Sequence, residues 1–295
     1  MGQLTALAGR GKDKQGDPGR LYVLATPLGN LGDLSPRAME ILASVKTVAC
    51  EDTRVSRRLL ELAGSNAGLL SCHDHNERRA SAGIVARLKR GDDVALLSDA
   101  GTPCISDPGY RVVCAVADAG LEVITVPGPS AVTALLSVSG LPTDRFSFEG
   151  FLPSSGSARR RVFERLADAG GTAVFYESPR RVLALLDDLA GQFDDPPVAV
   201  GRELTKLYEQ VLRGAASEVA AALREQGPRG EFTVAVALPP AEKGMAASEL
   251  RAELARLLDA GLSRRDTAIA LKSRGVSRSE VYRVADELAD ESADD

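Results

Sequence analysis

The sequence predicts an α/β protein with two α/β domains, mainly parallel or mixed sheets, and a small helical domain at its C-terminal end. Three observations lead to this expectation. Short apolar strands alternate with amphipathic helices, a polar segment near Gly150 interrupts the alternation, and only helical periodicity follows Gly244. Strand–loop–helix repeats of this kind are typical of sheets whose faces are covered by helices.

The first α/β domain is expected at residues 21–149, after a flexible leader at 1–20 that is rich in glycine and charge. Its strands are expected at Leu21–Ala25, Val94–Leu97 and Val123–Val126. After the first strand and its loop, Ser35 and Pro36 are the residue types favoured at an N-cap and at the first helical position. Apolar residues then recur at helical spacing, which predicts a helix.

The second α/β domain is expected at residues 150–240. Its strands are expected at Val174–Tyr176, Val198–Gly201 and Phe232–Leu238, with Ser178 as a candidate cap for the helix after the first. Beyond a linker at Pro239–Gly244, a helix-turn-helix-like domain is expected at 246–290, followed by an acidic tail at 291–295. Two capping boxes predict its last two helices, and they pair Ser263 with Asp266 and Ser277 with Glu280.

The most informative stretch is Ser98–Gly109, which follows an apolar strand and holds two glycines, two prolines and two aspartates in twelve residues. Glycine permits close approach of the backbone to a ligand, proline fixes the turn, and short polar side chains bind exposed N–H groups. A plain turn needs far fewer constrained residues. The composition therefore favours a ligand-binding loop at the end of a strand.

Composition excludes several classes of protein. No apolar run approaches the roughly 20 residues that cross a membrane, and the N-terminal stretch lacks the apolar segment of a secretory signal, so no membrane contact and a cytoplasmic location are expected. The net charge of −5 disfavours indiscriminate binding to nucleic acid, and no DNA partner is expected. The segment Leu262–Arg283 nevertheless carries six basic residues against two acidic ones.

The four cysteines form no CxxC pair, which indicates reduced thiols rather than a disulfide framework or a zinc ribbon. The run Cys72–His75 contains both histidines of the chain, and His73 would share a strand face with His75. No second cluster completes a ligand set, so no metal is expected. Polar loop residues or substrate contacts are the favoured interpretation.

No GxxxxGK[ST] motif is present and no GxGxxG follows a strand, which weakens phosphoryl-transfer and ordinary dinucleotide-binding interpretations. Four motifs together resemble the tetrapyrrole methylase superfamily, whose members use S-adenosylmethionine. They are LYVLATPLGNLGD from Leu21, SDAGTPCISDPG from Ser98, VPGPSAV from Val126 and FYESPRR from Phe175.

Three further runs are similar to one branch of that superfamily, which methylates the ribose 2′-hydroxyl of a cytidine in the decoding region of 16S rRNA. They are EDTR from Glu51, HDHNER from His73 and GRELTKLYE from Gly201. The resemblance covers about Leu21–Leu238 and extends to the basic helical end. It implies two α/β domains with the cofactor in the cleft between them, a homodimer, and 16S rRNA in the 30S subunit as the partner.

Carried over motif by motif, the resemblance implies a set of residues that contact S-adenosylmethionine. In the first half these are Pro27, Leu28, Asp99, Gly101, Thr102, Pro103, Ile105, Ser130 and Ala131. The second half would contribute Tyr176, Glu177, Gly201 and Leu238. Backbone donors, carbonyl acceptors and apolar walls suit a sulfonium joined to an adenosine.

Methyl transfer to a ribose hydroxyl is an in-line displacement in which positioning dominates, although a general base can assist. The candidate catalytic residues are Glu177, Lys206, Asp52 and His73, and spacing does not choose among them. Contacts to RNA phosphates are expected from basic clusters, namely Arg54, Arg57, Arg58, Arg159, Arg160, Arg161, Arg264, Arg265, Lys272 and Arg274.

Two other functions fit parts of the chain. One is carbon methylation of a tetrapyrrole by a sister enzyme of the same superfamily, which the basic clusters oppose. The other is a non-catalytic nucleic-acid-binding regulator built on the helix-turn-helix-like end, which leaves the strand–loop–helix motifs without a purpose. One departure from the resemblance is Arg180, since many relatives carry His after the Ser-Pro of FYESP.

Overall fold

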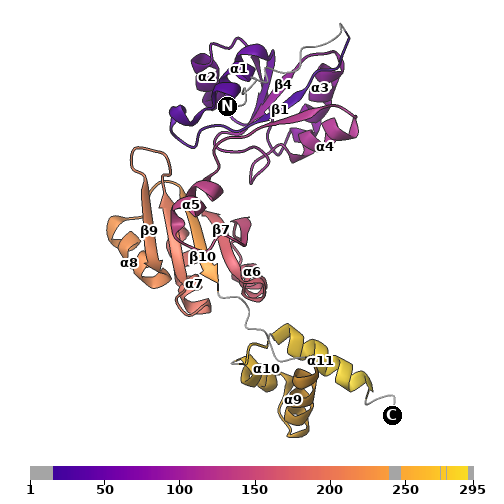
Figure 1. Cartoon of the computed structure of the whole chain (residues 1–295), viewed down its shortest axis with the longest axis vertical. Helices are drawn as coiled ribbons and strands as arrows, with labels where there is room; N and C mark the ends of the chain where they lie inside the picture. Colours follow the sequence, from indigo (N-terminus) through magenta and orange to yellow (C-terminus); the bar gives the residue numbers. More distant parts are fainter. Residues whose placement is uncertain (1–15, 239–246, 273, 277, 292–295) are drawn as a thin grey trace, which may run out of the picture.

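The computed structural model describes residues 16–238, 247–272, 274–276 and 278–291. Two units with a five-stranded sheet each come first along the chain, and a group of three helices follows (Figure 1). The predicted fold class is therefore confirmed. The expected linker Pro239–Gly244 and capping residue Ser277 lie outside the described residues, as do most of the expected leader and of the acidic tail.

The first sheet is parallel throughout, with the strand order β3-β2-β4-β1-β5. Its strands are β1 (Leu21–Leu24), β2 (Thr47–Cys50), β3 (Gly68–Ser71), β4 (Val94–Leu97) and β5 (Val123–Val126). The helices between them are η1 (Leu31–Asp33), α1 (Pro36–Ser44), α2 (Thr53–Leu62), α3 (Glu77–Lys89) and α4 (Tyr110–Asp118). The central strand β4 is buried along its whole length.

Local sequence explains how these elements begin. The Ser35 hydroxyl accepts a hydrogen bond from Ala38 N at 3.1 Å, and Pro36 occupies the first turn, as expected for the start of α1. Alternate residues of β1 face opposite sides of the sheet, so Leu24 packs in one apolar core and Leu21 in the other. The end of the expected leader belongs to this unit, because Gly19 N donates to Leu88 O at 2.7 Å.

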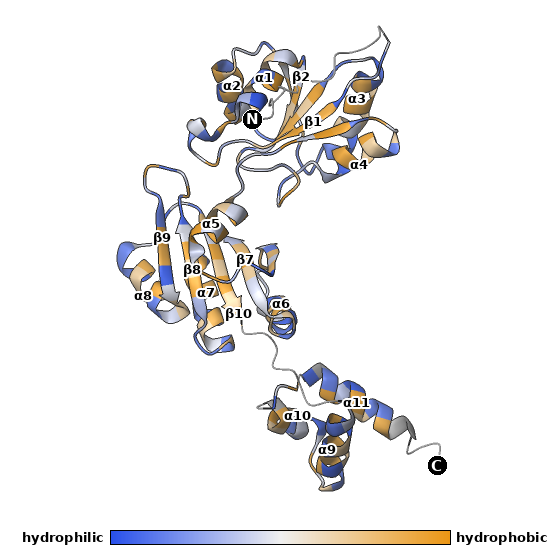
Figure 2. Cartoon of the chain, in the orientation of Figure 1, coloured by the Kyte–Doolittle hydropathy of each residue, from blue (hydrophilic) through white to orange (hydrophobic). Residues whose placement is uncertain are grey.

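The second sheet is mixed and has the order β6-β7-β10-β8-β9, in which only β6 and β7 pair in parallel. The strands are β6 (Phe146–Phe151), β7 (Gly171–Glu177), β8 (Pro197–Arg202), β9 (Gln210–Ala215) and β10 (Phe232–Leu238). The helices are α5 (Ala131–Ser139), α6 (Gly156–Ala169), α7 (Val182–Gln192) and α8 (Ala216–Gln226). Apolar residues concentrate on the strands and on the inner sides of the helices (Figure 2).

The second unit begins earlier than the expected boundary near Gly150. Helix α5 packs on the second sheet, where Leu135 shares an apolar cluster with Val174 and Ala235, and β6 is a strand of the same sheet. The reason is that the apolar face of α5 is buried against strands β7, β8 and β10 of this sheet. The polar stretch around Ser154 indicates a turn before α6 rather than a division between domains.

The C-terminal part consists of α9 (Ala247–Asp259), α10 (Arg264–Lys272) and α11 (Arg278–Glu291), which pack on one another around a small apolar core. The expected capping pair at the start of α10 is confirmed, since Asp266 N donates to the Ser263 hydroxyl at 3.2 Å. No described helix is long and apolar enough to span a membrane.

Candidate functional site

Three loops of the first unit meet at the carboxyl edge of its parallel sheet. The loops after β1 and β4 are joined by two backbone hydrogen bonds, from Thr26 N to Gly101 O at 2.8 Å and from Gly101 N to Thr26 O at 3.0 Å. The loop after β5 joins them, because the Thr102 hydroxyl donates to Pro129 O at 3.1 Å. Adjacent parallel strands end at one edge, so their loops form a single surface there.

The loop after β4 is Ser98–Gly109, the stretch that the sequence singles out, and its backbone is unusual. Gly101 and Gly109 have φ of +82° and +131°, and the non-glycine residues Cys104 and Ser106 have φ of 70° and 63°. A Cβ added at Gly109 would lie 2.8 Å from Cys104 Sγ. Glycine is therefore required at this position for both conformation and space.

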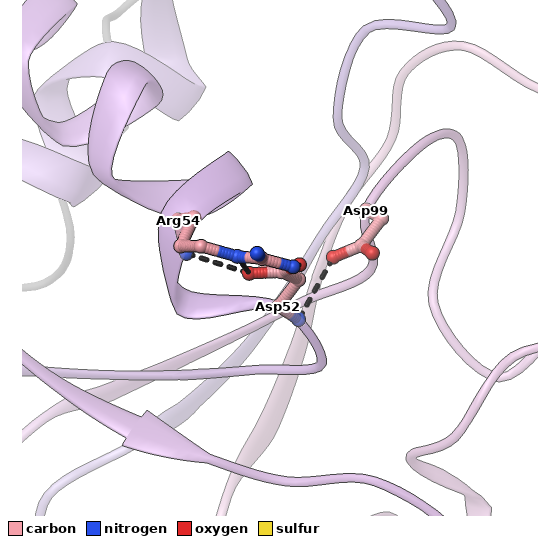
Figure 3. Close-up of polar contacts among 3 residues, drawn as sticks. All are labelled: Asp52, Arg54 and Asp99. Atoms are coloured by element: carbon pink, nitrogen blue, oxygen red, sulfur yellow. Dashed lines mark hydrogen bonds and ion pairs between the residues drawn. The ribbon is translucent and has the colours of Figure 1, made fainter.

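Two carboxylates hold the ends of this loop. Asp99 Oδ1 accepts a hydrogen bond from Asp52 N at 3.0 Å, which ties the loop to the residues just before α2 (Figure 3). At the other end, Glu77 Oε1 accepts from Gly109 N and Arg111 N, both at 2.9 Å, and the Glu77 side chain is buried. Glu77 therefore caps α4, whose own N-cap residue is a glycine.

A pocket of about 360 Å³ opens between this loop surface and the second unit. The first unit contributes Leu28, Ala100, Thr102, Ile105, Ser106, Asp107 and Ser130. The second unit contributes Ala131, Phe151, Tyr176, Glu177, Ser178, Pro179, Gly230, Glu231, Phe232 and Thr233. Its size lies in the range of about 300–1,000 Å³ that small-molecule sites occupy.

The residues expected around a cofactor separate into three groups. Those that line the pocket are Leu28, Thr102, Ile105, Ser130, Ala131, Tyr176 and Glu177. Those that lie in the same loops without lining it are Pro27, Asp99, Gly101 and Pro103. Gly201 pairs with the pocket residue Thr233 across β8 and β10, whereas Leu238 lies at the opposite end of β10 in the apolar core.

Several lining residues have no place in the sequence-based set. Ser178 and Pro179 belong to the FYESP motif, and Ser106 and Asp107 belong to the loop after β4, so the motifs contained a signal for them. For the segment Gly230–Thr233, the sequence motifs contained no signal of a place in the pocket. It reaches the pocket because β10 pairs antiparallel with β7, which sets Phe232 opposite Glu177.

Three of the four candidate catalytic residues form ion pairs, and two of them, Glu177 and Lys206, lie in the second unit. Glu177 accepts from Ser178 N and from Arg181 Nη2, both at 2.8 Å, and its side chain is 2% exposed. Lys206 Nζ lies 3.0 Å from Glu203 and 3.1 Å from Glu231. Burial acts to lower the pKa of Lys206, but the hydrogen bonds to both glutamates outweigh it and raise that pKa. Both pairings oppose a role as proton acceptor.

The other two candidates belong to the first unit, after β2 and β3. Asp52 caps α2 and forms an ion pair with Arg54 at 2.6 Å (Figure 3), and hydrogen bonds from the Arg54 side chain and backbone lower the pKa of Asp52 to about 2. His73 Nδ1 is buried without a hydrogen-bond partner in the described chain, and its ring lies 5.9 Å from that of His75.

Lys206 also connects the two units. Its side chain comes from the turn between β8 and β9 and passes Gly29 of the loop after β1, where an added Cβ would lie 2.3 Å from Lys206 Cγ. In a second contact between the units, Gly150 of β6 faces Ser106 in the same way, with an added Cβ 3.0 Å from its Oγ. Glycines therefore permit close contact between the units at two places.

The expected RNA-binding residues differ in how they are paired. On α2, the exposed residues Arg57 and Arg58 share a helix face with Arg54 and have no ion pair in the described chain. On α6, Arg159 pairs with Asp188 at 2.7 Å, while Arg160 and Arg161 are exposed.

In the C-terminal helices, two of the arginines expected to bind RNA form ion pairs with acidic residues of the same three helices. Arg264 pairs with Asp286, and Arg274 pairs with Glu249 and Glu253, whereas Arg265 is exposed without an ion pair in the described chain. The side chain of Lys272 lies outside the described set.

All four cysteines are free. The pKa of Cys72 and that of Cys104 are each raised to about 11, mainly by burial. These thiols are therefore protonated and poorly nucleophilic at neutral pH. Within the part of the chain that the structure describes, no three His, Cys, Asp or Glu side chains are placed to hold a metal ion. The Cys72–His75 run thus has no completed ligand set there.

Two solved structures share the fold. A cobalt precorrin-4 methyltransferase aligns with a TM-score of 0.57 and 18% identity, over 74% of this chain and 94% of that one. A uroporphyrin-III C-methyltransferase from Thermus thermophilus, complexed with S-adenosyl homocysteine, aligns with a TM-score of 0.53 and 19% identity, over 74% and 97%. At these identities the likeness concerns the fold alone.

Sequence similarity is much closer. Residues 20–220 match the family of Tetrapyrrole (Corrin/Porphyrin) Methylases. The chain is 50% identical over 222 residues to ribosomal RNA small subunit methyltransferase I of Xylella fastidiosa, across 74% of this chain and 81% of that protein. It is 42% identical over 276 residues to the protein of that name from Synechocystis, across 92% and 98%. The chain therefore belongs to the tetrapyrrole methylase family and, within it, to the family of ribosomal RNA small subunit methyltransferase I.

Proposed function

We propose that this protein uses S-adenosylmethionine to methylate the ribose 2′-hydroxyl of a cytidine in the decoding region of 16S rRNA, within the 30S subunit. The observation that carries the proposal is the pocket between the two units, because the motifs shared with the family form its walls. Relatives named for ribosomal RNA methylation, with 42% identity across 92% of this chain, support the substrate class.

The pocket fits the donor in size and chemistry. Leu28, Ile105 and Tyr176 provide apolar and aromatic surface for an adenosine, and the loop backbone around Thr102 supplies polar groups. The carboxylates of Glu51, Asp74 and Asp99 gather beside the same loop, and they favour a ligand that carries a sulfonium and an ammonium group. When bound, S-adenosylmethionine supplies an activated methyl group.

The protein's own contribution is mainly positioning. The two glycine contacts at Gly29 and Gly150 bring the units together around the pocket, which shields the reacting atoms from water. The exposed residues Arg57 and Arg58 lie on the helix that Asp52 joins to the pocket loop. They are suited to bind phosphates of a folded RNA next to the pocket, while the pocket selects the nucleotide.

The expected homodimer and the cytoplasmic location are part of this proposal. So are contacts between 16S rRNA and Arg160, Arg161 and Arg265, which are exposed.

Carbon methylation of a tetrapyrrole is the alternative within the same fold, and one assay separates it from the proposed activity. Labelled S-adenosylmethionine is incubated with the purified protein and either 30S subunits from cells that lack the protein or uroporphyrinogen III. We expect label in 16S rRNA at one ribose, mapped by resistance of the 2′-O-methylated position to alkaline cleavage. Label only in the tetrapyrrole would overturn the proposal.

A further inference from the structure

Four ionisable side chains line the pocket, and they differ in how they are engaged. Glu177 is paired with Arg181, and Glu231 is paired with Lys206. Burial raises the pKa of Tyr176 to about 12, so its hydroxyl stays protonated at neutral pH. Asp107 is the one pocket carboxylate without an ion pair in the described chain. It is therefore the carboxylate there that is free to accept a proton.

The backbone holds Asp107 in a defined place. Its neighbour Ser106 and the nearby Cys104 both have positive φ, a conformation that is strained for residues with a side chain. Such strain persists where the surrounding structure enforces it, and it gathers at functional sites. Here the loop is held by the hydrogen bond from Asp52 N to Asp99, by the Glu77 carboxylate and by the close contact of Gly150 with Ser106.

The groups that face Asp107 come from several elements, and the acidic ones act in the same direction. Burial is the main cause that raises the pKa of Asp107 to about 6. The carboxylate of Glu51, after β2, raises this pKa further, and those of Asp99 and Asp74 do so to a smaller extent. A hydrogen bond with Ser98 lowers it. Tyr176 faces it from β7, and His73 acts on Glu51 rather than directly on Asp107. A carboxylate that titrates near neutral pH is matched to general base catalysis.

We propose that Asp107 is a catalytic residue that accepts the proton of the ribose 2′-hydroxyl during methyl transfer, an inference that rests on the proposed function. The ribose oxygen forms a bond to the methyl carbon, and the bond from that carbon to the donor sulfur breaks with its electron pair going to sulfur. The hydroxyl proton moves to an Asp107 carboxylate oxygen. The products are the 2′-O-methyl ribose, a neutral thioether and protonated Asp107.

The test compares Asp107→Asn with Asp118→Asn, which removes the same charge from an exposed position of α4. Single-turnover methylation of 30S subunits is measured from pH 5 to 9, and binding of S-adenosylmethionine is measured by calorimetry without RNA. We expect a loss of about 10²–10⁴-fold in rate for Asp107→Asn with nearly unchanged donor affinity. In the wild type the rate rises with pH through about 6, and this rise disappears in Asp107→Asn.

Thermal stability gives a readout that needs neither donor nor RNA. The pKa of Asp107 is higher in the folded chain than the ordinary value, so ionised Asp107 destabilises the fold, increasingly as pH rises from about 4 to about 6. Asp107→Asn removes this penalty. Its melting temperature should exceed that of the wild type at pH 7, and the difference should shrink toward pH 4.

Each outcome decides between the interpretations. A wild-type rate in Asp107→Asn overturns the inference and leaves the proposed function standing. Loss of donor affinity in that variant also overturns it, because Asp107 would then be a cofactor ligand. If the wild-type protein itself transfers no methyl group to the subunit, the proposed function fails and the inference fails with it. A slow variant with intact donor binding and raised stability supports the inference.

Discussion

Glu77 Oε1 lies 2.9 Å from Gly109 N and 2.9 Å from Arg111 N, so one buried carboxylate closes the end of the pocket loop and caps the following helix. The two residues Glu77 and Gly109 come from different motifs, HDHNER and SDAGTPCISDPG. A carboxylate at a helix N-terminus also interacts favourably with the helix dipole. The contact therefore couples the HDHNER motif to the shape of the pocket.

Glu77→Ala should loosen the loop. Removing the carboxylate leaves a buried N–H without a partner, so we expect a loss of about 2 kcal/mol in the free energy of unfolding, measured in urea. Affinity for S-adenosylmethionine should fall as well, because the loop lines the pocket. Glu77→Gln keeps the acceptor oxygen and is the matched control, with smaller losses in both measurements. Equal donor affinity in all three proteins would contradict this role.

Gly109 and Gly120 form a matched pair for testing space at the loop. Both have positive φ, but an added Cβ meets Cys104 Sγ at 2.8 Å in Gly109 and nothing within 4 Å in Gly120. Gly120→Ala should lose about 1–2 kcal/mol for the backbone conformation alone. Gly109→Ala should lose about 1–3 kcal/mol more through overpacking. Unfolding in urea measures both, and the interpretation fails if the two variants are equally stable.

Filling the loop surface should block the cofactor. Gly101 has φ of +82°, and a Cβ there would lie 3.3 Å from Leu28 Cδ2, on a side chain that lines the pocket. We expect Gly101→Trp to remove measurable binding of S-adenosylmethionine in calorimetry. Circular dichroism checks that the chain is folded. Donor affinity retained by a folded Gly101→Trp would argue against the pocket as the donor site.

The basic face of α2 should contribute to RNA affinity in proportion to its phosphate contacts. For the double variant Arg57→Ala and Arg58→Ala, the slope of log affinity against log salt should decrease in magnitude by about 1–2. The control is the double variant Lys89→Ala and Arg90→Ala, which removes two exposed cations at the C-terminal end of α3 and should keep the wild-type slope. Binding to 30S subunits over a salt series gives the measurement, and an unchanged slope in both double variants would exclude the α2 face.

The helical end should act on RNA and not on the donor. Helices α9–α11 have an apolar core of their own, so a chain that ends at Gly244 should keep the fold of the two α/β units. We expect it to bind S-adenosylmethionine as the full chain does but to methylate 30S subunits more slowly. A truncated chain with full methylation rate would remove these helices from the RNA interface.

Much of the fold was predictable because its signals are local. Apolar runs located strands such as Val94–Leu97, and Ser35 and Pro36 marked a helix start that the structure confirms. The strands β2, β3, β6 and β9 were not predicted. In β6 and β9, glycine and a charged residue interrupt the apolar residues. The boundary between the units lies ahead of Gly150 because the apolar face of α5 is satisfied by the second sheet, which no local pattern reveals.

The sequence by itself determined the family, the loop at Ser98–Gly109 and most of the residues that line the first side of the pocket, because glycine, proline and aspartate restrict a backbone wherever they occur. Only the tertiary structure decided which charges are available. Glu177 and Asp107 are both carboxylic acids of the shared motifs, yet the fold gives Glu177 an arginine partner and leaves Asp107 among carboxylates. Ionisation depends on neighbours in space, and those neighbours are set by chain folding.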